Sequence, residues 1–239
     1  MNPKTFALSL AALALAAGGA QAAPAGKAEL SYFGRSSVKI RTASGFVVYV
    51  DPYAKGDYAE PADLVLVTHG HTDHNKVSLV ALKPGAAILA PKGAARGAGL
   101  QEIKEGEAKS FGPVSVRALP ASNKNHARSE SLGYLVSFDG IVLYHAGDTS
   151  YLPEMAGFAK YGIGWALLPC DDYWNMGPAE AAKCALAMKA RRVVPIHSSG
   201  DGLYGAKNAE ALAAAGASAG AGAFKGVLLE PGKSTLLEP

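Results

Sequence analysis

The sequence predicts one layered α/β domain, with β-sheets inside and helices outside. Hydrophobic residues make up 49% and charged residues 18% of the 239 residues, which suits a globular fold and argues against disorder. The first half of the chain is a series of short apolar segments typical of strands. In the second half, predicted helices and strands alternate, and no linker divides the chain.

Apolar segments bounded by Gly, Pro, Asp and Asn mark the strands of the first half. Residues 28–42 and 45–53 form a predicted pair joined by a turn at 43–45, and residues 63–70 form a buried strand that runs into a loop. Residues 74–83 are predicted to form a short helix. Further strands are expected over residues 86–93, 114–121, 132–138 and 141–148.

The second half contains the clearest helix, over residues 177–190. Pro178 suits its first turn, Glu180 favours the positive end of its dipole, and the following Ala, Leu and Met residues have high helix propensity. A second helix is expected over 151–162, and a buried strand over 191–198. The chain is then predicted to end in a helix and loop over 208–223 and in a hairpin over 225–239, turning at Pro231 and Gly232.

Residues 1–22 are typical of a secretion signal. Lys4 supplies the positive start, residues 6–17 are apolar, and "AQA" at 20–22 is a small-x-small cleavage site. The apolar stretch is too short to span a bilayer comfortably, which disfavours a membrane anchor. We therefore expect a single mature domain, residues 23–239, that is soluble and lies in the periplasm or outside the cell.

Charge and cysteine content narrow the classes of partner. Without Lys4 the mature chain has 22 Lys and Arg against 20 Asp and Glu, and no basic run stands out. This composition disfavours nucleic acid as a partner and favours a small-molecule substrate. Cys170 and Cys184 would lie in an oxidising compartment, where a disulfide can form. Because Cys170 follows a predicted strand and Cys184 falls inside a predicted helix, we expect two free, half-buried thiols.

The segment "VTHGHTDH", residues 67–74, carries three of the six histidines. His69 and His71 are two residues apart, so they can point the same way, and Asp73 and His74 follow around a turn. Imidazole nitrogen and carboxylate oxygen are zinc ligands. No cysteine lies near this segment in the sequence, so a closed thiolate site is not expected. The cluster offers more ligands than one open zinc site needs. It therefore predicts two adjacent metal ions rather than a merely solvated loop.

Two later segments are suited to complete this site. "YHAGDTS" places Asp148 at the end of a strand, after a glycine that lets the backbone approach closely. "VVPIHSS" places His197 at the end of another strand. Either residue alone is as often a turn or surface residue, but beside a metal-binding loop both become candidate ligands.

The motifs "THGHTDH", "YHAGDT" and "VVPIHSS", in this order and spacing, resemble the metallo-β-lactamase superfamily. They are most similar to its small single-domain branch of metal-dependent hydrolases, which includes sugar-phosphate lactonase-like members. The resemblance extends from about residue 30 to the C-terminus, and "VYVDPY" and "NMGPAEAAKCA" fit the same branch. It implies a four-layer αββα sandwich with the metals at one edge.

The resemblance also implies roles for individual residues. His69 and His71 match ligands of a first metal, and its third ligand is expected from the loop after residue 121. His126 is the candidate, although the branch often has Ala-Tyr-Asn there and a later histidine, so a single metal remains the alternative. The other matches are Asp73, His74 and His197 as ligands of the second metal, Asp148 as the carboxylate that bridges both, and Asp51 as a buried acid behind the ligands.

Three features leave part of the site open. His145 lies on a strand, so we expect a packed residue that supports the site rather than a ligand. "PCDDYWNMGP" stands where the branch usually has a glycine pair, and Asp171 in it either reshapes the pocket or faces water. Arg35 stands where the branch leads us to expect histidine. Both departures concern the substrate more than the fold.

The expected function is that of an exported zinc-dependent hydrolase. A hydroxide generated on zinc would attack a small ester, lactone, amide or phosphodiester, with Asp73 orienting it and taking its proton. Tyr53, Tyr173 and Asn175 are candidates to help hold the developing oxyanion. The alternative is a non-catalytic metal- or solute-binding protein on the same scaffold. An iron-dependent oxidoreductase is disfavoured, because that use of the fold generally has glutamate where His71 stands.

Overall fold

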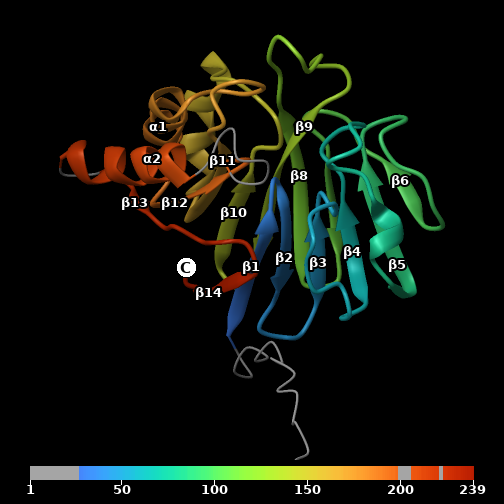
Figure 1. Ribbon diagram of the computed structural model, residues 1–239. Helices are drawn as coiled ribbons and strands as arrows, with labels where there is room; N and C mark the ends of the chain where they lie inside the picture. The colour runs from blue at the N-terminus through green and yellow to red at the C-terminus, as the bar shows by residue number, and fades with distance from the viewer. Residues whose placement is uncertain (1–26, 199–205, 221–222) are drawn as a thin grey trace, which may run out of the picture.

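Two seven-stranded sheets pack face to face in the computed structural model, which describes residues 27–198, 206–220 and 223–239 (Figure 1). The predicted signal peptide, residues 1–22, lies outside the described residues. The first sheet contains β1 (Ala28–Gly34), β2 (Ser37–Arg41), β3 (Val47–Val50), β4 (Ala62–Leu66), β5 (Leu82–Ala90), β6 (Leu100–Glu102) and β14 (Lys233–Leu237). The second contains β7 (Ala108–Phe111), β8 (Val114–Pro120), β9 (Leu132–Phe138), β10 (Ile141–His145), β11 (Trp165–Pro169), β12 (Arg192–Ile196) and β13 (Lys225–Gly226).

Each sheet is antiparallel in one part and parallel in the other. The first has the order β14-β1-β2-β3-β4-β5-β6 and becomes parallel from β3 onward. The second has the order β13-β12-β11-β10-β9-β8-β7, with β10 to β13 parallel. The carboxyl ends of β3, β4, β8, β10, β11 and β12 therefore lie at one end of the sandwich. This is where α/β proteins place their sites.

Three buried apolar clusters hold the layers together. The largest lies between the sheets and includes Leu30, Ile40, Val116 and Leu143. A second lies on the outer face of the second sheet, under α1 (Pro178–Ala187), α2 (Ala206–Ser218) and the 3₁₀ helix η2 (Pro153–Tyr161). A third covers the outer face of the first sheet, where loops and the short 3₁₀ helix η1 (Val77–Leu79) form the outer layer. The predicted α/β sandwich is confirmed.

Several predicted elements differ in detail. The helix expected over 74–83 is only η1, because Leu82 already pairs with Ala62 in the sheet. Residues 28–42 form two strands, which reverse where Gly34 and Arg35 adopt φ values of 117° and 51°. The helix expected over 151–162 is the 3₁₀ helix η2. The short strands β6 and β7 were not predicted; β6 is exposed and β7 partly so, which gives neither a buried apolar run.

The predicted C-terminal hairpin is wrong. β13 pairs with β12 in the second sheet, whereas β14 pairs with β1 in the first. The turn at Pro231 and Gly232 therefore crosses between sheets, and Gly232 donates its N–H to the carbonyl of Tyr32 at 2.8 Å. β14 covers the edge of the first sheet at β1, and β13 covers the edge of the second sheet at β12. If β13 and β14 paired with each other instead, the backbone groups at these edges would stay unpaired.

Both thiols are free, as predicted, but they are fully rather than half buried. Cys170 lies under the carbonyl of Ile196, and Cys184 contacts the sulfur of Met176 at 3.4 Å. Burial raises the pKa of each thiol to about 12, so neither is a reactive thiolate at neutral pH.

Among the described residues, no helix has the length and apolar character needed to cross a membrane.

Candidate metal centre

The loop after β4 holds the histidine motif in a tight turn. His74 donates its backbone N–H to the carbonyl of His71 at 3.1 Å. The side chain of Asn75 closes the loop by donating to the carbonyls of Gly70 and Ala94, at 2.9 and 3.2 Å. His71 and Thr72 are exposed as a result, while His69 and His74 turn inward.

Three imidazoles converge at the first half of the centre. His69 Nε2 and His126 Nε2 each lie 3.1 Å from His71 Nδ1. A tetrahedral zinc ion with Zn–N bonds of about 2.0–2.1 Å separates its ligand nitrogens by about 3.3 Å. Two of the three nitrogen pairs are close to this spacing and all three residues offer ligand atoms within 4.8 Å of one another, so we call them the three-histidine set.

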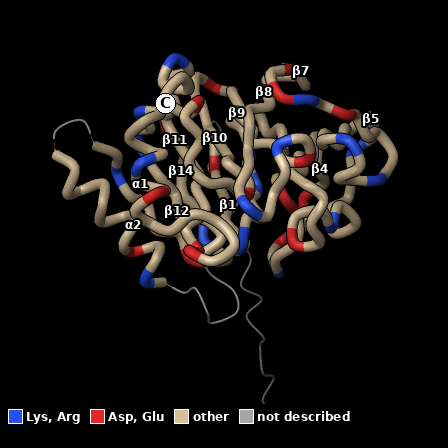
Figure 2. Tube along the Cα trace, turned by 90° about the horizontal axis from the view of Figure 1, so that it is seen from above, with Lys and Arg blue, Asp and Glu red and all other residues tan. Residues whose placement is uncertain are grey.

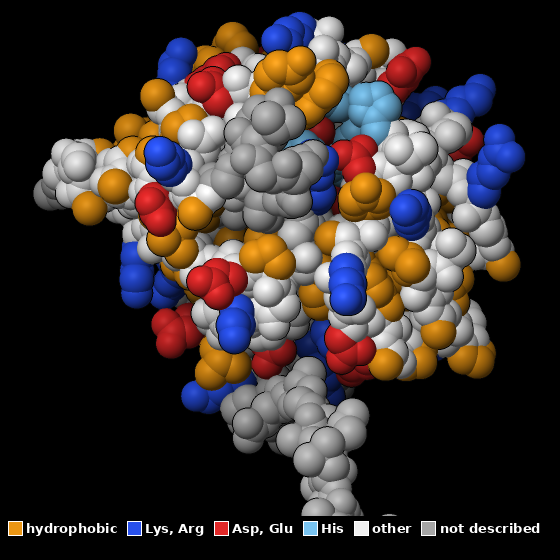
Figure 3. All heavy atoms as spheres, in the orientation of Figure 1, with side chains coloured by type: hydrophobic (Ala, Val, Ile, Leu, Met, Phe, Trp, Pro, Cys, Tyr) orange, Lys and Arg blue, Asp and Glu red, His pale blue; other side chains and the backbone are white. Residues whose placement is uncertain are grey.

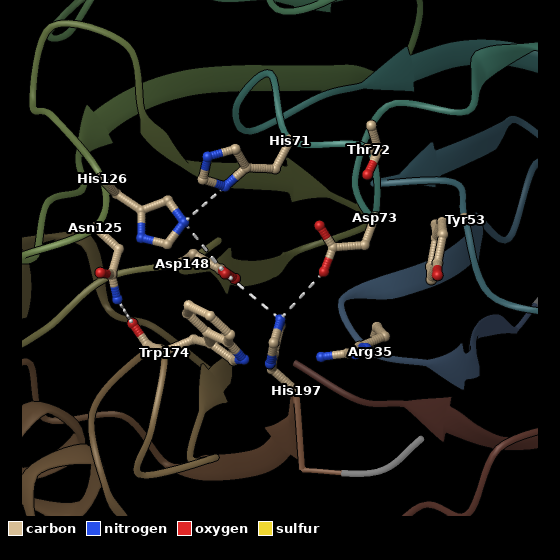
Figure 4. Close-up of a pocket in the computed structure, with 10 residues that line it drawn as sticks. All are labelled: Arg35, Tyr53, His71, Thr72, Asp73, Asn125, His126, Asp148, Trp174 and His197. Atoms are coloured by element: carbon tan, nitrogen blue, oxygen red, sulfur yellow. Dashed lines mark hydrogen bonds and ion pairs between the residues drawn. The ribbon is translucent and has the colours of Figure 1, made fainter. Parts of the chain in front are cut away.

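The second half combines carboxylate and imidazole. Asp73, His74 and His197 place potential ligand atoms within 4.8 Å of one another, and we call them the mixed set. Asp148 lies between the two sets: its Oδ1 is 3.4 Å from His74 Nε2, and its Oδ2 is 3.4 Å from His197 Nε2 and 3.5 Å from His126 Nε2 (Figure 4). All seven predicted ligands thus meet in one place.

Four of the five imidazoles in the two sets have a partner beside the nitrogen that faces away from the centre: three form a hydrogen bond there, and His197 forms an ion-pair contact. Thr68 Oγ1 donates its hydroxyl proton to Asp51, so it accepts the Nδ1 proton of His69. Each hydrogen-bond partner fixes the tautomer, leaving the Nε2 lone pair of His69, His74 and His126 free. The pairs are His69 with Thr68 at 3.0 Å, His74 with Asp51 at 2.8 Å, His126 with Asn123 at 2.7 Å, and His197 with Asp171 at 2.8 Å.

Sequence reasoning anticipated Asp51 but missed Asn123 and Asp171. Asp171 follows β11, which lies between β10 and β12 in the second sheet. Asp148 follows β10, and His197 follows β12. An acid at the carboxyl end of the central strand of three was the signal that could have identified it. Asn123 lies only three residues before His126, where its side chain closes a local turn.

Buried polar atoms at the centre lack hydrogen-bond partners among the described residues. These are His74 Nε2, Asp148 Oδ1 and both ring nitrogens of His197, whose Nδ1 has only its ion-pair contact with Asp171. Burying such atoms without a partner is costly, and His74 Nε2 and His197 Nε2 each lie 3.4 Å from a carboxylate oxygen of Asp148. Imidazole nitrogen with carboxylate oxygen is a donor set that suits zinc and related divalent ions. The residues present therefore fit a bound metal.

Charge at the centre is strongly coupled. Burial alone would lower the pKa of His74, but the carboxylates of Asp148 and Asp51 raise it well above its usual value. Burial opposes charge on His197 too, yet Asp148, Asp171 and Asp73 raise its pKa to about 9. Burial and the neighbouring His74 lower the pKa of His69 to about 3. The mixed set thus attracts positive charge, whereas His69 stays neutral.

Two further residues position the ligands. His145 Nε2 donates to the carbonyl of Ser36 at 2.9 Å, and its Nδ1 accepts the N–H of Gly147 at 3.2 Å, so both nitrogens are used by the backbone. Gly147 has φ of 61°, and an added Cβ would lie 2.8 Å from Thr68 Cβ and 3.0 Å from the carbonyl oxygen of Leu132. Only glycine therefore lets β10 deliver Asp148 so close to the histidine loop.

A cavity of about 580 Å³ opens onto both sets. Asp73, His71, His126 and His197 lie on its floor, Tyr53 and Arg35 on one side, and Asn125 and Trp174 on the other (Figure 4). Histidine, acidic and hydrophobic side chains reach the surface together at this end of the molecule (Figure 3). Of the three suggested oxyanion partners, Tyr53 lines the cavity, whereas Tyr173 and Asn175 do not. The side chain of Asn175 instead bonds to Asp171 and Asn123.

Comparison with known proteins agrees with this geometry. Residues 29–197 match the β-lactamase superfamily domain. A UPF0173 metal-dependent hydrolase from Myxococcus xanthus is 32% identical over 202 residues, covering 74% of this chain and 72% of the relative.

Among solved structures, Igni18, a metallo hydrolase from Ignicoccus hospitalis, superimposes with a TM-score of 0.73 at 23% identity, covering 89% and 99% of the two chains. CmlA, a diiron β-hydroxylase from Streptomyces venezuelae, shares the fold with a TM-score of 0.67 at 17% identity, covering 91% of this chain and 55% of its own. The sequence match and the shared sandwich place this chain in the metallo-β-lactamase superfamily, among its metal-dependent hydrolases.

Proposed function

We propose that this chain is an exported zinc hydrolase that binds two ions and cleaves a small ester, lactone, amide or phosphodiester. The orientation of the imidazoles carries the proposal. Three of the five histidines in the two sets give their outward proton to a fixed partner, and the outward nitrogen of His197 lies 2.8 Å from the carboxylate of Asp171. The three-histidine set would hold one ion, the mixed set the other, and Asp148 would contact both.

When bound, such ions make water acidic enough to supply hydroxide near neutral pH, and they polarise the group under attack. Asp73 is the residue suited to handle the proton. Its side chain is 29% exposed and lies on the floor of the cavity, whereas Asp148 is buried. His74 and His197 lower its pKa even though burial opposes this, so Asp73 is an anion ready to orient the nucleophile and accept its proton.

The cavity supports a small-molecule substrate. Its volume of about 580 Å³ is in the range of small-molecule sites, and its wall combines aromatic side chains with Arg35 and Asn125. Lys and Arg are interspersed with Asp and Glu along the described chain, which gives little support to nucleic-acid binding (Figure 2). Export rests on residues 1–22, and intact mass of the secreted fraction should show an N-terminus at Ala23.

The first experiment measures metal content by elemental analysis together with hydrolysis of p-nitrophenyl esters, lactones, amides and bis(p-nitrophenyl) phosphate. We expect two zinc ions in the wild type and about one in His126→Ala. CmlA shows that this fold also carries iron, so iron in place of zinc would contradict the proposal. One zinc in both proteins would contradict the second site.

Asp73→Ala separates the hydrolase from a non-catalytic binding protein. In a hydrolase, turnover of the cleaved substrate should collapse, by more than the roughly 10²-fold contribution of a general base. In a binding protein, the only change would be weaker metal binding. The matched control is Asp57→Ala, an exposed aspartate that only caps Ala59.

A further inference from the structure

Two loops that each contact or carry one ligand, His126 of the three-histidine set and His197 of the mixed set, also contact each other. The first, after β8, carries Asn123 and His126. The second, after β11, carries Asp171 and Asn175, and it contacts His197 through Asp171. Both loops are places where the sequence departs from the pattern of its branch. Their contact suggests that the two departures belong together.

The contact is a continuous chain of side-chain hydrogen bonds that ends in an ion-pair contact. His126 Nδ1 donates to Asn123 Oδ1 at 2.7 Å, and Asn123 Nδ2 donates to Asn175 Oδ1 at 2.9 Å. Asn175 Nδ2 donates to Asp171 Oδ2 at 2.9 Å, and the same oxygen lies 2.8 Å from His197 Nδ1 in an ion-pair contact. Three hydrogen bonds and one ion-pair contact thus connect His126 to His197.

Both ends of the chain are held rigidly. Asp171 is buried, and its Oδ1 accepts the backbone N–H groups of Tyr173, Trp174 and Asn175 at 2.6 to 3.0 Å. The carboxylate therefore cannot rotate away from His197. At the other end, Asn123 Oδ1 also accepts the N–H of Asn125 at 2.8 Å. With its oxygen occupied in this way, the amide must present its NH₂ group to Asn175.

We propose that Asn123, Asn175 and Asp171 form a positioning bridge that holds His126 and His197 in one geometry and makes binding at the two metal sites interdependent. The inference rests on the proposed function, because both histidines serve as ligands in it. Asn175 is the informative residue, since its side chain bonds to Asn123 and Asp171, which are not ligands themselves. An effect of Asn175 on both ions has to pass through the bridge.

The bridge also fixes one wall of the cavity. Asn123 Nδ2 and Asn125 Nδ2 donate to the carbonyl of Trp174, at 3.2 and 2.9 Å. Trp174 lines the cavity beside His126 and His197 and is 47% exposed (Figure 4). A change in the bridge should therefore alter the substrate wall as well as the metal ligands.

The test replaces Asn175 with Ala and measures both zinc affinities by competition with a chromophoric chelator. Losing a partner behind a ligand costs 10–100-fold in metal affinity, so we expect both affinities to fall by about tenfold or more. The visible spectrum of the cobalt(II)-substituted protein should change too, because it reports ligand geometry. A second variant, Asn123→Asp, keeps an acceptor for His126 but removes the donor to Asn175, and it should also weaken the ion at His197.

Asn125→Ala is the matched control. Its side chain donates to the same carbonyl of Trp174 and is not one of the three residues that form the bridge. We expect both zinc affinities and the cobalt spectrum to stay at wild-type values in this variant. Wild-type affinities and spectrum in folded Asn175→Ala would overturn the bridge alone. Fewer than two ions in the wild type would overturn the proposed function and, with it, the coupling.

Discussion

The three-histidine set and the mixed set face the same cavity but are held in different ways. His69 and His126 are supported by the neutral side chains of Thr68 and Asn123, and His71 is exposed. In the mixed set, His74 and His197 are buried and backed by carboxylates, those of Asp51 and Asp171.

This difference decides how each set responds to positive charge. A carboxylate behind an imidazole makes it a more basic ligand, whereas a hydroxyl or amide orients the ring without adding charge. The pKa of His197 is accordingly raised to about 9, by Asp148, Asp171 and Asp73 against the effect of burial, while burial and His74 lower that of His69 to about 3. The mixed set should therefore bind its ion more tightly.

The largest expected effect comes from the residue that the two sets share. Asp148→Asn removes the negative charge that lies 3.4 to 3.5 Å from ligand nitrogens of both sets. We expect metal affinity in both sets to fall by more than about 100-fold, beyond the loss caused by an outer partner. Elemental analysis after gel filtration would check this. Two ions retained per chain would show that the sets are independent of Asp148.

The next effect concerns the backbone that delivers Asp148. Gly147→Ala should lower the free energy of unfolding by about 3 kcal/mol, because left-handed φ strain of about 1–2 kcal/mol adds to a steric clash of about 1–3 kcal/mol. Gly140 also has positive φ, but its nearest contact would be Pro239 at 3.8 Å. Gly140→Ala should therefore cost only about 1 kcal/mol. Urea unfolding of both variants compares them, and equal losses would refute the close approach at Gly147.

Asp51→Asn tests the supporting residues that connect the sets. Asp51 Oδ2 accepts from both His74 Nδ1 and Thr68 Oγ1, and Thr68 in turn supports His69. An amide NH₂ there would face His74 Nδ1 and favour the wrong tautomer. We expect a 10–100-fold loss of affinity in the mixed set and a smaller loss in the three-histidine set. Zinc titration with a competing chelator measures both, and the opposite order would contradict the assignment.

The smallest expected effect is the difference between the two sets in the unaltered protein. Stepwise chelation should remove the ion of the three-histidine set first, at a chelator concentration about tenfold lower, which corresponds to about 1.4 kcal/mol. His126→Ala and His197→Ala identify the steps, since each should abolish one of them. The step that survives in His197→Ala belongs to the three-histidine set. If it occurs at the higher of the two chelator concentrations seen in the wild type, the carboxylate partners do not raise the metal affinity of the mixed set.

Much of the fold was predictable because its signals are local. Buried strands such as β4, β9, β10 and β12 are short apolar runs bounded by turn residues, and α1 begins at a proline preceded by glycine. The C-terminal hairpin failed for the opposite reason. β13 and β14 are separated by only a few residues, yet each pairs with a strand distant in sequence from the other's partner. Which edge a strand covers is a property of the assembled sheets.

The candidate site divides in the same way. His69, His71, Asp73 and His74 occupy one short loop, so their spacing alone predicts a shared centre. Asp148 and His197 follow strands, and parallel strands bring their carboxyl ends together. Asn123 carries no such signal, and that of Asp171, its place after the central strand β11, is weak because a single acid or amide after a strand is common in turns. Their role appears only when His197 and His126 are beside them.

The sequence by itself determined which residues are candidate ligands: their chemistry, their dense spacing and their positions after strands all point to a metal centre. Only the tertiary structure decided how each is held, from the tautomers set by Asp51, Asn123 and Thr68 and the contact of Asp171 with His197 to the bridge through Asn175. The physical reason is distance. Ligand type is a property of one side chain, whereas a hydrogen bond between residues far apart in the chain exists only after the two sheets have packed.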